Sequence, residues 1–394
     1  MIITSLRSSA LECLPSGCRH WIALFASAWL IGCGVGTGGT GAFGSAPVSG
    51  FGSIFVGTIE FDDTMATVFN DDGAPVMRDG NELRLGMMAD VEGATIATGP
   101  NGPASPATSV RLTRVVVGPV AATDVGRRTL SVLGQTVAIN GSTAFDRTLH
   151  GGLAALKTGD QVSVYGLAGS SGQIVATRVE PAPGGEAWRL RGVVTGLDAT
   201  AMRFGIGTAT FDYNGAANVP ASLANGQLVH LKLSGTSVGD VLGVSAFGRV
   251  STPPADAAHV EAEGLVAALT MPGQFRVGAT TVDASRATVD PAPAALVAGA
   301  HAEVTGRLEA GVLVADKVKL LTAQEAESRP YQIAGAVSGL SAASFVVRGI
   351  PVDASTATFV NGSAASLANG VTVHVRGVLS ADGTAVRALR IAFP

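Results

Sequence analysis

A unit of about seventy residues recurs five times along this chain, and this repetition constrains the fold more than any other feature. Each copy carries a glycine followed two residues later by a β-branched residue, which we expect to mark its first strand. These positions are Gly57/Ile59, Gly118/Val120, Gly192/Val194, Gly264/Val266 and Gly335/Val337, at intervals of 61, 74, 72 and 71 residues. Each copy is therefore expected to fold as one small unit, and units of this size gain stability where neighbours brace one another, in an arrangement that the repeats do not specify.

Within a copy, the pattern predicts three strands, a short helical turn and two further strands. The third strand ends in an apolar residue followed by Asp or Asn, at Asp62, Asn140, Asp212, Asp283 and Asp353. Most copies then have an Ala/Leu-rich stretch that ends in Leu-x-x-Gly, which is typical of a helical turn with a glycine C-cap, at Gly159, Gly226, Gly299 and Gly370. The fourth strand alternates, with Val371, Val373 and Val375 on one face, which indicates a half-buried strand.

This order of elements is that of the OB-fold, a small Greek-key barrel whose closure leaves few exposed strand edges. We therefore predict an all-β protein with one short helix per repeat, built as about five tandem OB-like barrels. The high glycine content, 52 residues, and the low charged fraction, 14%, agree with short strands and tight turns. The predicted repeats are residues 50–113, 114–183, 186–251, 258–322 and 330–394.

The N-terminus has the features of a bacterial export signal. Basic residues precede an eleven-residue apolar core, Trp21 to Ile31, which is too short to span a bilayer comfortably. At the end of this core, Leu30-Ile31-Gly32-Cys33 resembles a lipobox, which implies cleavage between Gly32 and Cys33 and acylation of Cys33. An ordinary signal peptide with an incidental cysteine remains the alternative. We assign residues 1–32 to the signal and 33–49 to a Gly-rich tether.

Cleavage of the signal would remove two of the three cysteines. Cys33 would be its one cysteine, so neither a disulfide nor a cysteine metal site is expected. Loss of Arg7, Arg19 and Glu12 changes the formal net charge from −4 to −5, which disfavours nucleic acid as a partner because its binding needs a basic face. We predict no cofactor.

Four segments resemble a known family. They are residues 50–68, Leu133 to Val137, Gly159 to Gly166 and Gln173 to Glu180. The family is a domain of unknown function (number 5666) that occurs in tandem in bacterial lipoproteins. The resemblance covers the whole mature body and is strongest in repeats one and two, whereas repeat three departs most, at Val244 to Val250. Because the family has no assigned activity, the resemblance implies an architecture and a cellular address only.

Two short motifs imitate enzyme signatures. Gly235-Thr236-Ser237-Val238-Gly239 matches G-x-S-x-G, but it is expected in a turn between strands and not between a strand and a helix. The glycines from Gly34 to Gly39 match G-x-G-x-x-G without a preceding strand or a following helix. Neither context supports catalysis or dinucleotide binding, so we predict no catalytic residues and no enzyme.

The recurring polar residues have a structural explanation. A short Asp or Asn side chain at a strand end bonds nearby backbone N–H groups, so we interpret that position as a turn and not as a metal ligand. His230, His301 and His374 have the outward parity of the fourth strands, which predicts a solvated face. No H-x-H or H-E-x-x-H spacing occurs, so we assign no metal site. Aromatic residues are scarce, and many Phe positions fit the core.

Repetition without a unique catalytic constellation predicts a lipid-anchored, non-enzymatic binding or scaffold module of the cell envelope. Its partners would be the membrane, through the lipid on Cys33, and an unknown envelope protein or glycan. Gly34 after the cysteine favours the outer membrane by analogy with lipoprotein sorting. The alternative is a carrier or sensor of a small envelope ligand, a glycan or a metal. A membrane β-barrel is disfavoured by short strands without aromatic girdles.

Overall fold

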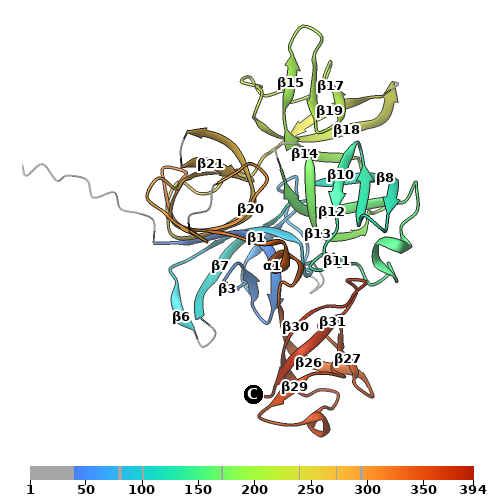
Figure 1. Cartoon of the computed structure of the whole chain (residues 1–394), viewed down its shortest axis with the longest axis vertical. Coiled ribbons are helices and arrows are strands. Elements are labelled where there is room, and N and C mark those ends of the chain that lie inside the picture. Colours follow the sequence, from blue (N-terminus) through green and yellow to red (C-terminus); the bar gives the residue numbers. More distant parts are fainter. Residues whose placement is uncertain are drawn as a thin grey trace, which may run out of the picture. The chain divides into compact units, whose positions relative to one another are not determined.

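The computed structural model describes residues 40–78, 82–99, 102–169, 172–238, 240–271, 273–292 and 296–394 (Figure 1). Gly32 and Cys33, the predicted cleavage and lipidation positions, lie outside these residues. The described chain is almost entirely β-structure, arranged as closed five-stranded barrels, which confirms the predicted fold class. None of its helices is long and apolar enough to cross a membrane.

Barrel 2 shows the shared topology. Its elements are β8 (Val116–Asp124), β9 (Thr129–Val132), β10 (Gln135–Ala138), β11 (Ala144–Phe145), η1 (Gly152–Ala155), β12 (Gln161–Ala168) and β13 (Gln173–Pro181). The end of β8 pairs with β9, β9 with β10, and β10 runs parallel to β13. Strand β12 then joins β13 to the start of β8 and closes the ring. This is the strand order of the OB-fold.

Barrels 3, 4 and 5 repeat this ring. Barrel 3 consists of β14 (Arg189–Val193), β15 (Thr195–Asp198), β16 (Arg203–Ile206), β17 (Ala209–Asp212), β18 (Leu228–Val238) and β19 (Val241–Gly248). Barrel 4 consists of β20 (Ala257–Met271), β21 (Gln274–Val277), β22 (Thr280–Asp283), β23 (Thr288–Asp290), β24 (His301–Glu309) and β25 (Val312–Leu320). Barrel 5 consists of β26 (Tyr331–Ser341), β27 (Ser344–Val347), β28 (Ile350–Asp353), β29 (Thr358–Val360), η2 (Ala364–Ser366), β30 (Thr372–Leu379) and β31 (Val386–Ala392).

Barrel 1 corrects the predicted tether. It consists of β1 (Ala42–Phe51), β2 (Ile54–Val56), β3 (Ile59–Asp62), β4 (Thr67–Phe69), β5 (Met88–Gly93), β6 (Ala97–Gly99) and β7 (Gly102–Leu112). Residues 42–49, which we assigned to the tether, therefore form most of its first strand. Phe43 and Val48 are buried. The small residues have a packing role, because a side chain on Gly44 would press against the Phe61 ring.

The same correction restores the repeat period. Gly57 does not lie in the first strand but in the turn between β2 and β3. The position equivalent to Gly118 is Ala46, because Ala46 faces Ala89 of β5 as Gly118 faces Val162 of β12. Ala46 precedes Gly118 by 72 residues, in line with the later intervals. The short first interval came from matching a turn glycine with strand glycines.

Glycine bulges bend the fourth strands. The pairing of β12 with β13 shifts register at Gly166, and the corresponding pairs of barrels 4 and 5 shift at Gly306 and Gly377. A side chain at any of these glycines would collide with a carbonyl oxygen of the last strand. Closing a small barrel needs such local bends, and glycine permits the close backbone approach.

The predicted helical turn forms in some copies only. It is present as η1 in barrel 2 and η2 in barrel 5, whereas the described segment of barrel 3 between β17 and β18 contains turns without a helix. The predicted C-cap glycines Gly159, Gly226, Gly299 and Gly370 all have positive φ. The turn geometry is therefore common to these copies even where no helical hydrogen bond completes it.

One helix lies between the predicted repeats 258–322 and 330–394. Helix α1 (Ala323–Glu327) follows barrel 4, and Thr322 starts it with a capping box to Glu325. The segment packs on barrel 2, where the Gly141 N–H donates to Glu327 Oε2 at 2.7 Å and the Ser142 hydroxyl donates to the Ala326 carbonyl at 2.7 Å.

The barrels also join through their first strands. Strand β1 runs parallel to β20 over four residue pairs and to β26 over two, while β8 pairs antiparallel with β14. Barrels 2 and 3 share one hydrophobic cluster, and barrels 1, 4 and 5 each centre on a cluster of their own. The fully buried phenylalanines include Phe61, Phe204, Phe275 and Phe345, as the sequence predicted for the core.

Candidate functional site

The polar residue that ends the third strand is a turn residue in every barrel. Its side-chain oxygen accepts the backbone N–H two residues later at 2.9 to 3.0 Å, in the pairs Asp62/Thr64, Asn140/Ser142, Asp212/Asn214, Asp283/Ser285 and Asp353/Ser355. Hydrogen bonds from these turns lower the pKa of all four aspartates. The turn interpretation is confirmed, and no described group of three His, Cys, Asp or Glu residues could hold a metal ion.

The histidines do not share one environment. His374 is exposed as predicted, but His230 is only 5% exposed and the prediction of a solvated position is wrong for it. His301 is half-buried, with its Nε2 atom 2.8 Å from Oε1 of the buried Glu263, which also binds Arg329. Burial alone would raise the pKa of Glu263, but Arg329 and His301 outweigh it and lower that pKa. The alternation of residues along a strand predicts which side chains point out of their own barrel. Another part of the chain can still cover that outer face.

The serine of the G-x-S-x-G motif lies within strand β18, although we expected it in a turn. A strand position lacks the sharp strand-to-helix turn that exposes a nucleophile. This motif therefore gives no candidate site.

A cavity of about 360 Å³ lies where barrels 1, 2 and 5 meet, and it is the candidate functional site. Its apolar wall includes Phe51, Leu85, Phe145, Ile350 and Leu379. Its charged lining consists of four arginines and one aspartate, namely Arg84, Arg147, Arg178, Arg348 and Asp146. The volume falls within the range of small-molecule sites, and the lining combines apolar surface with few charged groups.

Arg178 holds the charged wall together. This buried side chain on β13 binds Asp146 at 3.1 Å and Glu180 at 2.7 Å and donates to the Leu85 carbonyl of barrel 1 at 3.3 Å. Burial would raise the pKa of Asp146, but hydrogen bonds from Thr148 and the charges of Arg178 and Arg84 lower it overall. Asp146 is therefore ionised at neutral pH and held by these bonds.

The other three arginines keep donors available. Arg84 lies 3.5 Å from Asp146, and its side chain is 42% exposed. Arg348 donates from Nε to the Ala334 carbonyl at 2.9 Å, and its φ of 49° places it in the left-handed region at the hairpin turn between β27 and β28. Arg147 is exposed and has no ion pair among the described residues. The two carboxylates that these arginines bind, Asp146 and Glu180, cannot neutralise four guanidinium groups, so the cavity favours an anion.

No sequence pattern indicates this cavity. The patterns that predict the barrels recur in every copy, whereas these arginines occupy different positions in three different copies. No spacing along the chain indicates that Arg84, Arg147 and Arg348 meet, because barrel packing alone brings them together.

Comparison with known proteins gives a family. Residues 117–180, 263–319 and 334–392 match the family described as domain of unknown function (DUF5666). The family model thus matches three segments of the chain, which is consistent with a tandem-repeat protein. The matched segments lie in barrels 2, 4 and 5. Barrel 3 lies outside them, as does barrel 1, although we expected the resemblance to be strong there.

The other comparisons add little. No curated protein matches the chain. Among solved structures, the chain is similar to "drosophila Unr CSD456" at 13% identity, covering 50% of this chain and 84% of that chain. The TM-score of 0.14 is too low for an argument about fold or function. The family match therefore implies no activity.

Proposed function

We propose that this protein is a lipid-anchored, non-enzymatic binding protein of the bacterial cell envelope. Its ligand would be a small molecule that carries a carboxylate or phosphate next to an apolar part. The single observation behind this proposal is the cavity of about 360 Å³ in which four arginines face one aspartate beside an apolar wall. The sequence suggested either a binding or scaffold module or a carrier or sensor of a small ligand. The cavity favours the carrier or sensor, with an anionic ligand in place of a metal.

Binding fits this lining better than catalysis does. Arginine stays protonated in proteins, so it positions anions but does not transfer protons at neutral pH. Asp146 is already engaged with Arg178 and Thr148, and its lowered pKa makes it a weak base. The charged lining therefore offers no pair of a nucleophile and a base.

The ligand class can be tested by calorimetry with decyl phosphate and decyltrimethylammonium. The full exported chain with Cys33→Ser is suitable because no detergent then competes for the cavity. We expect decyl phosphate to bind and the cationic analogue not to bind. Arg84→Gln combined with Arg348→Gln should weaken decyl phosphate binding at least tenfold, about 1.4 kcal/mol. Arg203→Gln, on an exposed pair in barrel 3, is the matched control. Equal binding of both amphiphiles would contradict the proposal.

The anchor can be tested separately by cell fractionation. One acyl chain gives marginal membrane binding, at about 0.8 kcal/mol per buried CH₂, whereas two or more hold a protein stably. Cys33→Ser should therefore move the protein from the membrane fraction to the soluble fraction. Cys18→Ser, within the predicted signal, should leave it membrane-bound. If the Cys33→Ser protein stays with the membranes, the lipoprotein assignment fails while the cavity proposal stands.

A further inference from the structure

Two neighbouring pairs of basic residues lie on the outer face of barrel 3, toward barrel 1. On the antiparallel strands β14 and β18, Arg189 is directly opposite Lys232, and Arg191 is directly opposite His230. Like charges in directly opposed positions destabilise a sheet unless a counter-charge offsets them. The two pairs differ in whether an acidic side chain supplies this counter-charge.

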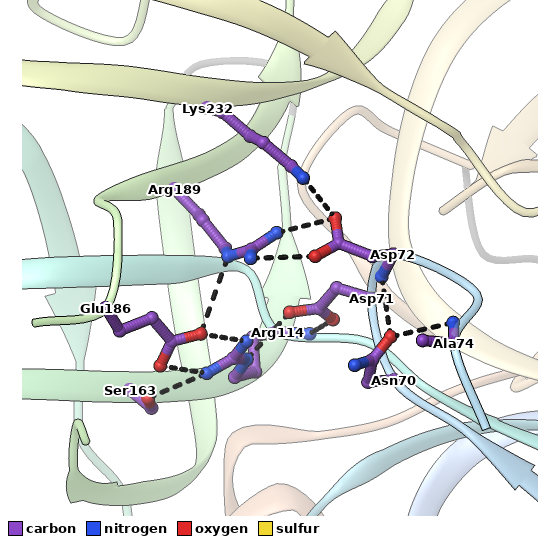
Figure 2. Close-up of polar contacts among 9 residues, drawn as sticks. All are labelled: Asn70, Asp71, Asp72, Ala74, Arg114, Ser163, Glu186, Arg189 and Lys232. Carbon is purple, nitrogen blue, oxygen red and sulfur yellow. Dashed lines mark hydrogen bonds and ion pairs between the residues drawn. The ribbon is translucent and has the colours of Figure 1, made fainter. Parts of the chain in front are cut away.

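The first pair has its counter-charge. Figure 2 shows Asp72 of barrel 1 between Arg189 and Lys232. Its two oxygens accept from both terminal nitrogens of Arg189 at 2.9 Å, and its Oδ1 atom lies 2.7 Å from Lys232 Nζ. Hydrogen bonding to Arg189, with a further contribution from Lys232, holds the pKa of Asp72 far below its usual value.

The second pair has no comparable partner, because the nearby Asp71 is occupied. Asp71 accepts the Arg114 N–H at 2.8 Å through Oδ1 and Arg114 Nε at 2.7 Å through Oδ2 (Figure 2). The far end of Arg114 binds Glu186 at 2.6 and 2.8 Å. Arg191 Nε and His230 Nε2 are both buried without a hydrogen-bond partner among the described residues.

Arg191 and His230 both line a small cavity. Its volume is about 10 Å³, enough for one water-sized or halide-sized species. The charged residues that line it are Asp71, Arg111, Arg114, Arg191, His230 and Arg249. Asp71 is already paired with Arg114, and the guanidinium of Arg111 lies 5.1 Å from the centre of the Phe69 ring. The cavity is therefore small, largely enclosed by protein and surrounded by excess positive charge.

We propose that this cavity binds a chloride-sized monovalent anion that gives Arg191 and His230 the counter-charge which Asp72 gives to Arg189 and Lys232. The anion accepts the Arg191 Nε–H and, from the protonated ring, the His230 Nε2–H. Burial of these groups without a partner is costly, and a buried cation needs an opposite charge or an acceptor. A larger oxyanion exceeds the volume.

Anion binding should be coupled to protonation of His230. Burial lowers the pKa of His230 to about 4, with Arg191 and Arg189 contributing, against the charge of Asp71 and a hydrogen bond with the Arg249 backbone. Arg111 and Arg114 also face the cavity. An anion beside the ring favours the charged imidazolium, so it should raise this pKa. A neutral water could bridge the same atoms but would leave the pKa near its anion-free value.

The direct test is an NMR titration of the His230 Cε1 proton in sodium chloride and in sodium gluconate at equal ionic strength. We expect a pKa at least one unit higher in chloride, together with a higher Tm. Arg191→Met should abolish both differences. Arg307→Met, which removes an exposed ion pair with Glu309 in barrel 4, is the matched control and should retain them.

A second measurement uses the unaltered protein, so it does not depend on the folding of a variant. Crystals soaked in sodium bromide should give an anomalous peak within hydrogen-bonding distance of Arg191 Nε and His230 Nε2. A water in that position without an anomalous peak, or a His230 pKa that is the same in chloride and gluconate, would overturn the proposal.

Discussion

Barrel 1 contacts its neighbours in two different ways. Toward barrels 4 and 5, its first strand forms main-chain pairs, from Ala42 to Ser45 with β20 and at Gly50 and Phe51 with β26. Toward barrel 3, the described residues show no strand pairing, and side-chain charges make the contact instead, with Asp72 bound by Arg189 and Lys232. The same small barrel thus has a strand-paired side and a charge-paired side.

The two sides should respond differently to conditions. Peptide N–H and C=O groups carry no titratable charge, and salt screens their hydrogen bonds little, so the strand-paired side depends mainly on close backbone approach. Charge pairs depend on protonation and on ionic strength, although burial weakens the screening. Four changes test this difference between the two sides, in order of decreasing expected effect.

Removal of Arg114 should have the largest effect. Arg114→Met leaves Asp71 and Glu186 without their main partner, and the side chain of Asp71 is only 5% exposed. Breaking a buried ion pair from one side costs about 3–5 kcal/mol, so we expect a loss of this size in the free energy of unfolding, measured with urea. Arg203→Met on an exposed pair is the control and should change little. Equal effects of both variants would show that the junction charges add no stability.

Acidification should weaken the charge-paired side next. The folded-state pKa of His230 is about 4, against an ordinary histidine value of 6.5, so the unfolded chain binds more protons between these pH values. Stability should therefore fall as pH drops from about 6.5 to about 4, by on the order of 3 kcal/mol in the absence of chloride. His230→Gln should reduce this slope, as measured by urea unfolding in gluconate across the range. An unchanged slope in the variant would assign the pH dependence to other groups.

Gly50→Ala addresses the strand-paired side. The new Cβ would lie 2.5 Å from the Gln332 carbonyl oxygen and 2.9 Å from Phe55 Cδ2, which would push β1 away from β26. Overpacking of this kind costs about 1–3 kcal/mol, and the loss should be the same at low and high salt. Gly184→Ala has open space around its Cβ and serves as the control. A loss that varies strongly with salt would contradict the main-chain origin of this contact.

Lys232→Met should have the smallest effect. Asp72 keeps both of its hydrogen bonds to Arg189, and the Lys232 side chain is 33% exposed. Such a pair contributes less than about 1 kcal/mol, and the difference from the original protein should shrink in about 1 M salt. Thermal unfolding at two salt concentrations measures it. An effect as large as that of Arg114→Met would mean that Lys232 stabilises the junction by more than its charge.

The parts of the fold that depend on local sequence were predictable. The strand order and the Asp62-type turns follow from patterns within one copy, because each barrel closes within its own residues. Strand β1 was missed because its small residues resemble a flexible tether, and their burial depends on Phe61 and on neighbouring strands. The helical turn was overpredicted because turn geometry and a glycine cap do not require a completed helix.

The candidate cavity and the anion site were not predictable from the repeats. Both consist of residues that are not shared among the copies, such as Arg84 with Arg348, or Arg191 with Arg249. The alternation along the fourth strand correctly predicts that His230 lies on the outer side of its barrel, but the predicted solvent exposure is wrong. Alternation says which side of a barrel a residue occupies and not what covers that side.

Local sequence patterns are therefore sufficient to specify the repeating barrel, because the contacts that close each barrel join residues close together in the chain. Which outer faces are buried, and where charges from different barrels meet, depends on how the barrels pack. Asp72 and Arg189 are separated by 117 residues, and Arg128 and Glu327 by 199. Contacts over such distances leave no periodic trace, so only the packing of the barrels shows where a ligand could bind.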